Sequence, residues 1–383
     1  MKPIPTQREL FDIPDHIAYF NCAGNSPLLN ESIKRMQTGV LAKSHPWERR
    51  ASDFFENSEI IRKLSSEIFG GDSDGYAIIP AASYGLSTAA RAIEPQLQKG
   101  DSILLIAEEF PSNVLPWKRV ALERGANLIT VPVPENGNWT EAIINRFESK
   151  VKVAALSTCH WTNGARINLE AIRQECDKIG CMLVVDATQS LGAMPFPIEQ
   201  IKPDFLVASG YKWLLCPYGF SLMYVSEEWR KARPLEETWL ARKNAEDFAS
   251  LVNYSDNYMP GSRRFDVGEK CSEAILPGVV AAFEQLKKWG VPQIANSLSA
   301  INSKITTQLI QLGFQLPSEN QRCPHLFGAT IPNSYAGNLV SELGKRNVFV
   351  SQRGKSIRFA PHLHINEEDI RQLTDTLANL IKC

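Results

Sequence analysis

The sequence lacks the features that mark several common functional classes. Its 41 basic and 42 acidic side chains leave a formal net charge of −1, so no positive excess favours binding to nucleic acid or to an anionic membrane. No strand-like segment is followed by Gly-x-Gly-x-x-Gly, which argues against a nicotinamide-dependent dehydrogenase. Internal repeats, long charge runs and low-complexity segments are also missing, so we expect an ordinary globular protein.

Three further absences bear on location and on metals. No apolar leader follows Met1 and no run approaches about 18 uncharged apolar residues, so neither a signal peptide nor a membrane span is predicted. The eight cysteines include no Cys-x-x-Cys pair and several lie in apolar runs, so we interpret them as reduced thiols of a cytoplasmic protein. His362 and His364 would share one face of an extended segment, but without an apparent third ligand they predict no metal site.

Short apolar segments alternate with helical ones through the first part of the chain. We predict strands at Tyr76–Ile79, Ser102–Ala107, Asn127–Val131, Lys152–Ser157, Met182–Asp186, Phe205–Ser209 and Phe220–Val225. Helical segments such as Ala171–Ile179 separate them. This alternation predicts an α/β fold with a mostly parallel seven-stranded sheet sandwiched by helices. With 383 residues, 44% of them hydrophobic, the chain is long enough for a second, smaller domain.

The second part of the chain has a different pattern. After an irregular polar stretch from about residue 239 to 265, we predict helices and short strands in mixed order. The helices are Leu276–Trp289, Ile294–Leu312 and Glu367–Ile381, and the strands are Phe327–Ile331, Val348–Val350 and Ile357–Phe359. This pattern indicates a smaller α+β domain. We expect residues 16–245 to form the large domain, and residues 1–15 with 246–383 the small one.

Two polar residues stand where apolar strands end. Asp186 closes one predicted strand, and Lys212 follows another in the sequence Ser209-Gly210-Tyr211-Lys212. Open α/β sheets bind ligands at the carboxyl ends of their strands. An acid near a pyridine nitrogen keeps that ring protonated, and a lysine can condense with an aldehyde, so the pair favours pyridoxal phosphate. Taken singly, Asp186 could be a helix cap and Lys212 a solvated charge.

A phosphate site is predicted earlier in the chain. Ser83 and Tyr84 follow the strand Tyr76–Ile79 and precede the helical segment Leu86–Ile93. Backbone N–H groups at a helix start, joined by the two hydroxyl groups, would make a cradle for an anion. Ser83 acting only as a helix N-cap is the alternative for this segment.

These residues lie in segments that together resemble the class V aminotransferase family of pyridoxal-phosphate enzymes, which includes cysteine desulfurases and isopenicillin N epimerase. The segments are Ala18–Gly24, Ser83-Tyr84, Glu109–Trp117, Asp186–Gln189, Ser209–Lys212 and Ile357–His362. The resemblance covers nearly the whole chain. It implies an aspartate-aminotransferase-like large domain, a pyridoxal 5'-phosphate cofactor and a homodimer.

The resemblance also implies roles for single residues. Lys212 would form the Schiff base with the cofactor and carry protons at the substrate carbon, while Asp186 would pair with the pyridine nitrogen. Gln189 would lie near the phenolic oxygen. The phosphate would contact Ser83, Tyr84 and Ser209, and Tyr211 is also placed in the cofactor site.

Two positions depart from the family pattern. Phe110 stands where many relatives have a histidine stacked on the pyridine ring; a phenyl ring stacks as well but transfers no proton. Trp161 stands where desulfurase-like relatives have an asparagine. Thr162 or Asn163 could replace that contact with the ring oxygen, or Trp161 could shape the substrate pocket.

The substrate class is predicted mainly from Arg358. The resemblance makes it the arginine that clamps a substrate carboxylate, which a planar guanidinium meets bidentately. A surface ion pair is the alternative. Asn21 and Ala23 are also predicted to contact the substrate, an amino acid or a keto acid.

The reaction is left open among several outcomes. Desulfurases carry a nucleophilic cysteine shortly before this arginine, whereas residues 349–357 contain none. We therefore favour an aminotransferase over a cysteine desulfurase or other lyase and over an epimerase, and a noncatalytic protein of this fold is a further alternative.

The resemblance places Arg264–Glu269 near the neighbouring subunit's phosphate. His45, Trp47 and Arg50 are candidates for the substrate entrance.

Overall fold

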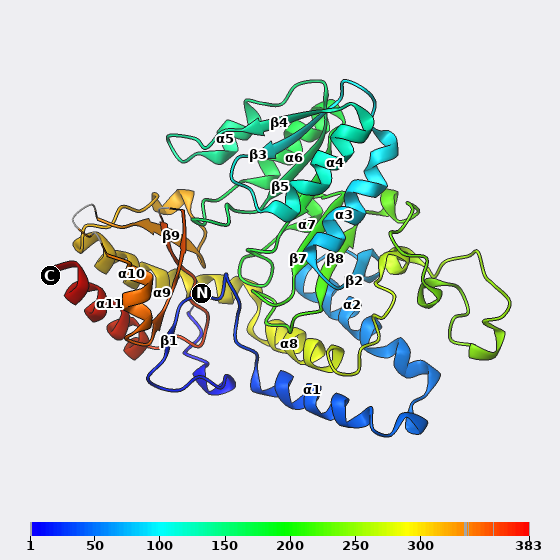
Figure 1. Cartoon of the computed structure of the whole chain (residues 1–383), viewed down its shortest axis with the longest axis horizontal. Helices are drawn as coiled ribbons and strands as arrows, with labels where there is room; N and C mark the ends of the chain where they lie inside the picture. The colour runs from blue at the N-terminus through cyan, green and yellow to red at the C-terminus, as the bar shows by residue number, and fades with distance from the viewer. Residues whose placement is uncertain (1, 333–334, 336, 355, 383) are drawn as a thin grey trace.

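The predicted seven-stranded sheet is present. The computed structural model describes residues 2–332, 335, 337–354 and 356–382 (Figure 1). Its large sheet has the strand order β2-β8-β7-β6-β5-β3-β4. The strands are β2 (Tyr76–Ile79), β3 (Ser102–Ile106), β4 (Asn127–Val131), β5 (Val151–Ser157), β6 (Met182–Asp186), β7 (Phe205–Ser209) and β8 (Ser221–Val225). All neighbours are parallel except β8, which is antiparallel to β2 and β7. The α/β prediction is therefore confirmed.

Helices cover both faces of this sheet, which is why its strands are apolar almost throughout. Successive residues of β2 point to opposite faces: Tyr76 and Ile78 join one core cluster, Ala77 and Ile79 the other. One face packs against α3 (Ala82–Ile93) and α4 (Leu115–Arg124). The other face packs against α2 (Glu56–Phe69), α5 (Trp139–Ile144), α6 (Leu169–Ile179), α7 (Ile198–Ile201) and α8 (Leu276–Trp289). The helix α1 (Asn30–Ala42) lies along α8 (Figure 1).

The C-terminal part forms a separate α+β unit, at the left of Figure 1. Strands β11 (Ser351–Arg353), β12 (Ser356–Phe359) and β9 (Phe327–Thr330) form an antiparallel sheet in that order. The short strand β1 (Ala18–Tyr19) pairs in parallel with β10 (Val348–Phe349). A third core cluster fills this unit and includes α10 (Leu339–Gly344), α11 (Glu367–Lys382) and the second half of α9 (Val291–Gln311). The first half of α9 packs in the core of the large sheet through Val291, Ile294 and Leu298.

The predicted domain limits remain a prediction, and the packing suggests other limits. α8 lies within the predicted small domain, yet its buried residues join the core of the large sheet and it packs against α1 and α2. β1 lies within the predicted large domain, yet it pairs with β10. We propose that the C-terminal unit begins near α9 and includes β1.

Between β8 and α8 the chain is irregular, as predicted. It contains only short 3₁₀ helices, among them Gly261–Phe265, and loops out at the right of Figure 1. None of the helices in the described part of the chain is both long and apolar enough to cross a bilayer.

A buried ionic cluster fixes the end of this irregular stretch. The Asp266 carboxylate accepts a hydrogen bond from the Ile78 backbone N–H at 2.8 Å and pairs with Lys270 at 2.7 Å and with Arg62. The side chains of Asp266, Lys270 and Arg62 have no exposed surface. One carboxylate thereby joins β2, α2 and the segment that leads to α8.

Removing this carboxylate should destabilise the protein strongly. Asp266→Asn leaves the buried charge of Lys270 without its ion-pair partner and leaves Arg62 with the partly exposed Glu59 alone, and uncovering a buried charge typically costs about 3–5 kcal/mol. Urea denaturation of the variant measures the loss. As a control, Glu31→Gln removes an exposed pair with Arg35 on α1 and should cost no more than about 0.5 kcal/mol. Equal losses for the two variants would contradict this account of the cluster.

Candidate active site

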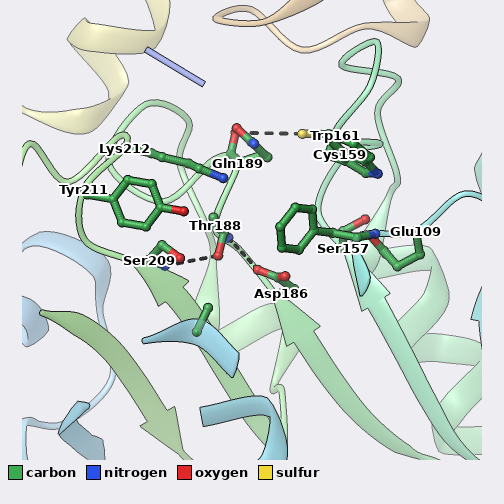
Figure 2. Close-up of a pocket in the computed structure, with 12 residues that line it drawn as sticks. Glu109, Ser157, Cys159, Trp161, Asp186, Thr188, Gln189, Ser209, Tyr211 and Lys212 are labelled. Atoms are coloured by element: carbon green, nitrogen blue, oxygen red, sulfur yellow. Dashed lines mark hydrogen bonds between the residues drawn. The ribbon is translucent and has the colours of Figure 1, made fainter. Parts of the chain in front are cut away.

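A pocket lies at the carboxyl ends of β5, β6 and β7 (Figure 2). It contains about 390 Å³ of space, part of it open to solvent. Its lining residues are Ala82, Glu109, Phe110, Ser157, Cys159, Trp161, Asp186, Thr188, Gln189, Ser209, Tyr211 and Lys212. The structure thus brings together seven of the predicted site residues: Phe110, Trp161, Asp186, Gln189, Ser209, Tyr211 and Lys212.

Asp186 is held rigidly on the floor of this pocket. It is the last residue of β6 and only 6% exposed. One carboxylate oxygen accepts a hydrogen bond from the Thr188 backbone N–H at 2.9 Å, and the Thr188 hydroxyl accepts one from the Ser209 N–H at 3.1 Å. Burial raises the pKa of Asp186, while the Thr188 hydrogen bonds and the Lys212 charge oppose that rise.

Lys212 enters the pocket from the turn after β7, and Figure 2 shows its amine reaching toward the centre. Its side chain forms no ion pair with any residue in the described ranges. The amine lies 5.5 Å from the centre of the Phe110 ring and 5.4 Å from that of Tyr211. Burial lowers the pKa of Lys212 to about 8 against the opposing effect of the Asp186 charge. The amine therefore loses its proton at a lower pH than an exposed lysine does.

Gly210, two residues before this lysine, stands where a larger residue would clash. A Cβ atom at Gly210 would lie 2.5 Å from the Phe220 carbonyl oxygen, closer than any side chain tolerates. The strand β7 can therefore turn directly into the pocket only with glycine at this position, which explains part of the Ser-Gly-x-Lys pattern.

An N-terminal segment covers the same turn. The Ser26 backbone N–H donates to the Tyr211 carbonyl at 3.1 Å, and the Ala23 carbonyl accepts from the Gln189 side chain at 3.1 Å. The Trp213 indole donates to the other end of that Gln189 amide, also at 3.1 Å. The Gln189 side chain is thus fixed from two sides.

The two predicted substrate contacts in this segment do not line the pocket. Ala23 touches the site only through its bond to Gln189. Asn21 pairs with Ala360, two residues beyond Arg358, and its side-chain oxygen is buried without a hydrogen-bond partner in the described part of the chain. Their roles toward a substrate remain predictions.

Arg358 is buried beside the pocket wall and is 1% exposed. Its guanidinium donates to the Ser351 hydroxyl at 3.2 Å and to the Trp161 carbonyl at 2.9 Å. Its Nη2 is buried with no partner among the described residues. Burial lowers the pKa of Arg358 to about 9, and the charge of Arg353 adds to this effect. A buried guanidinium edge without a partner is suited to an incoming carboxylate.

The predicted phosphate contacts Ser83 and Tyr84 lie away from the pocket lining. Ser83 is exposed, and burial together with the Glu236 carboxylate raises the pKa of the Tyr84 hydroxyl, which faces that acid. Ala82, the first residue of α3, lines the pocket instead, and no side chain caps this helix. Free backbone N–H groups at the start of α3, with the hydroxyls of Ser209 and Tyr211, form the available anion cradle.

Glu109 is a pocket residue for which the sequence analysis gave no role. It is 7% exposed, and its carboxylate accepts from the Phe110 N–H at 2.7 Å and from the Asn113 side chain at 3.5 Å. Burial raises the pKa of Glu109 to about 7, and the nearby Asp186 charge adds to the rise. Its position just after β3, which ends at the same sheet edge, was the available signal.

Four other lining residues were also missed: Ala82, Ser157, Cys159 and Thr188. Ser157 is the register partner of Asp186 on the adjacent strand. It is also the last residue of a predicted strand, and this position was the signal that could have identified it. Cys159 is buried, with its thiol 3.8 Å from the Gln189 carbonyl. Nothing in the sequence marked this cysteine as different from the others.

The candidate entrance residues lie elsewhere in the single chain. His45 and Trp47 contact each other edge to face and are exposed, and neither they nor Arg50 line the pocket. Glu269 lines a separate hollow beside α1. The predicted roles of these residues depend on a second subunit and remain predictions.

The pocket fits pyridoxal phosphate by its donor set. Asp186 offers a buried carboxylate for a ring nitrogen, Lys212 an amine without an ion-pair partner in the described ranges, and Phe110 an aromatic face. The uncapped start of α3 offers N–H groups for a phosphate. No group of three or more histidine, cysteine or acidic side chains is arranged to hold a metal in the described part of the chain.

Comparison with known proteins agrees with this geometry. The sequence model of the family described as "Aminotransferase class-V" matches residues 18–369. A "probable cysteine desulfurase" of Pyrococcus abyssi is 23% identical over 97% of this chain and 96% of its own length. The "uncharacterized aminotransferase YcbU" of Bacillus subtilis is 24% identical over 99% and 98%. The solved structure of C-DES with glycine covalently linked to its PLP cofactor superposes with a TM-score of 0.86, at 18% identity, over 98% of this chain and 99% of that one.

The fold and the site therefore define a pyridoxal-phosphate-dependent enzyme. More specifically, the chain belongs to the class V aminotransferase family, as the family match over most of its length shows. The predicted cofactor is confirmed at this level.

The raised pKa of Glu109 should be visible in the stability of the cofactor-free protein. Folded Glu109 keeps its proton up to about pH 7, whereas a glutamate in the unfolded chain ionises from its ordinary value of 4.5. The unfolded state then binds fewer protons, so this residue lowers the free energy of unfolding as pH rises from about 4.5 to 7. Glu109→Gln should match the wild type near pH 4 and exceed it by roughly 3 kcal/mol at pH 8.

Urea denaturation at several pH values measures this difference. The exposed residue Glu246 provides a control, since Glu246→Gln should follow the wild type across the whole range. A constant offset between Glu109→Gln and the wild type would count against a buried, protonated Glu109.

Proposed function

We propose that this enzyme acts at the α-carbon of an amino acid, and that its reaction is transamination. The observation that carries the proposal is the Lys212 amine, buried in one pocket with the Asp186 carboxylate and with its pKa lowered to about 8. Arg358 lies behind the same wall, and its Nη2, which has no hydrogen-bond partner among the described residues, supports a substrate that carries a carboxylate.

The pocket residues divide the task of holding the cofactor. Asp186 would hold a proton at the ring nitrogen, and Phe110 would stack on the ring. Gln189, fixed by Ala23 and Trp213, would contact the phenolic oxygen. When bound, pyridoxal phosphate accepts the electrons that are released at the substrate's α-carbon.

Lys212 is the group in the pocket that can move the substrate proton. Its neutral fraction near pH 8 can take a proton from the α-carbon, because an efficient general base has a pKa close to the working pH. Phe110 cannot take part in this transfer. The atom to which Lys212 returns the proton decides the product, and return to an atom other than the α-carbon leads to a keto acid.

The thiols of the site favour transamination over desulfuration. Residues 349–357, which precede Arg358, contain no cysteine. Cys159 lines the pocket, but its hydrogen bond with Cys323 and its burial raise the pKa of its thiol well above the usual value, which makes it a poor nucleophile. Cleavage of a C–S bond is the second candidate, because relatives are named as cysteine desulfurases.

We also propose a homodimer. Large apolar side chains are exposed around the hollow beside α1 and around its C-terminal end: Val40, Leu41, Trp47 and Trp239 are each at least 40% exposed. Exposed apolar surface of this kind is typical of protein interfaces. Light scattering coupled to gel filtration should give twice the mass of the 42.8 kDa chain.

Cofactor attachment is the first test of the proposal. The purified protein with added pyridoxal phosphate should absorb visible light, and borohydride should abolish the band and fix the cofactor on Lys212 in a peptide map. Lys212→Ala should lose this covalent attachment, whereas Lys178→Ala on the exposed face of α6 should keep it. A wild type that stays colourless would refute the function.

The reaction type follows from an amino-acid panel with product analysis by mass spectrometry. We expect a keto acid, and Arg358→Gln should lower kcat/KM by about 10²-fold or more because it removes a buried, charge-assisted partner of the substrate carboxylate. Alanine with sulfide as the products would select desulfuration instead, and an inverted amino acid would select epimerisation.

A further inference from the structure

A second arginine shares a hairpin with Arg358. In the pairing of β11 with β12, Ser351 lies opposite Arg358, and Arg353 lies opposite Ser356. Because alternate residues of a strand point to the same side, Arg353 and Arg358 project from one face of the hairpin. They occupy a diagonal cross-strand position, for which the typical separation is about 7–8 Å.

Arg353 reaches the wall of the pocket. Its guanidinium carbon lies 5.7 Å from the centre of the Trp161 ring, and that ring contacts Phe110 edge to face at 5.4 Å. Both aromatic residues line the pocket. The positive charge of Arg353 helps to lower the pKa of Lys212 and of Arg358, which places it near both.

This charge has no acidic partner in the described part of the chain. Among the described residues no carboxylate pairs with Arg353, and its guanidinium donates only to the Gln352 carbonyl, at 2.7 Å. Two other arginines of the C-terminal unit do have such partners: Arg346 pairs with Glu342, and Arg371 with Glu368. Arg353 is half-buried, so its charge is only partly solvated, and it repels two cations nearby.

We propose that Arg353 and Trp161 form a side-chain subsite that selects amino acids with a second carboxylate, and the keto acids that correspond to them. The inference rests on the proposed function, in which Arg358 takes the α-carboxylate and Lys212 acts at the α-carbon. Arg353 then meets the distal carboxylate from the same face of the hairpin. The Trp161 ring holds the guanidinium by a cation–π contact and orients its planar edge for a bidentate bond.

Kinetics with matched substrates test the subsite. We expect the wild type to prefer aspartate or glutamate over the amide of the same length, because the amide leaves the Arg353 charge unpaired. Arg353→Gln should lower kcat/KM for the acid by about 30-fold or more and change that for the amide by less than about threefold. Arg353→Lys should retain part of the preference, since it keeps the charge and loses the planar fork.

A binding measurement adds a readout that does not need turnover. Calorimetry on the cofactor-loaded protein should show that succinate binds more tightly than propionate, and Arg353→Gln should abolish that difference. Trp161→Phe serves as a second variant. It removes the indole ring that supports Arg353, and it should weaken succinate more than propionate.

The outcomes separate this inference from the proposed function. If the wild type binds no cofactor, the proposed function fails. If the wild type carries the cofactor band and turns over amino acids but prefers amides or neutral side chains, the subsite alone is refuted. Equal losses for acid and amide in Arg353→Gln would also overturn it, since they would show a structural role only. The cofactor band of each variant shows that it has folded.

Discussion

The removal of Asp186 and Lys212 from water is the constraint on which the site depends. Burial raises the pKa of the acid and lowers that of the amine, so each is pushed toward its neutral form while the charge of the other opposes the change. A protonated pyridine nitrogen would give Asp186 a permanent counter-charge, and an aldehyde would consume the Lys212 amine covalently. The same ligand therefore offsets the free-energy cost of burying the acid and that of burying the amine, which explains why both groups lie in one pocket.

The rest of the fold holds these two groups in register. Parallel strands β6 and β7 bring their carboxyl ends to one edge, and Gly210 allows β7 to turn there without a clash. The N-terminal segment binds the backbone of this turn through Ser26. Since β1, just before that segment, pairs with β10, the C-terminal unit and the lysine are connected through a few residues.

The sequence predicted the strands well because most of them are apolar on both faces and most follow a helical segment of a different period. Asp186 and Lys212 were found because each lies beside a strand end. Sequence reasoning was weaker where tertiary packing decides: β11 is short and polar, and only its pairing with β12 makes it a strand. Ser83 was predicted to contact the phosphate because it carries a hydroxyl at a helix start, but the first helical turn places the preceding residue, Ala82, in the pocket lining instead. The burial of Glu109 likewise depends on neighbours far away in the chain.

The charges around the pocket also limit what can enter it. Lys212, Arg353 and Arg358 are basic, whereas Asp186 and Glu109 are the acidic residues on its wall, and burial keeps Glu109 protonated below about pH 7. Positive charge therefore exceeds negative charge where water is partly excluded, and this excess favours anions. A phosphate ester at the start of α3 is one such anion, and a carboxylate at Arg358 is another. Neither anion would pair with Arg353, so the charge of Arg353 would stay without a counter-charge after the cofactor and an α-carboxylate have bound.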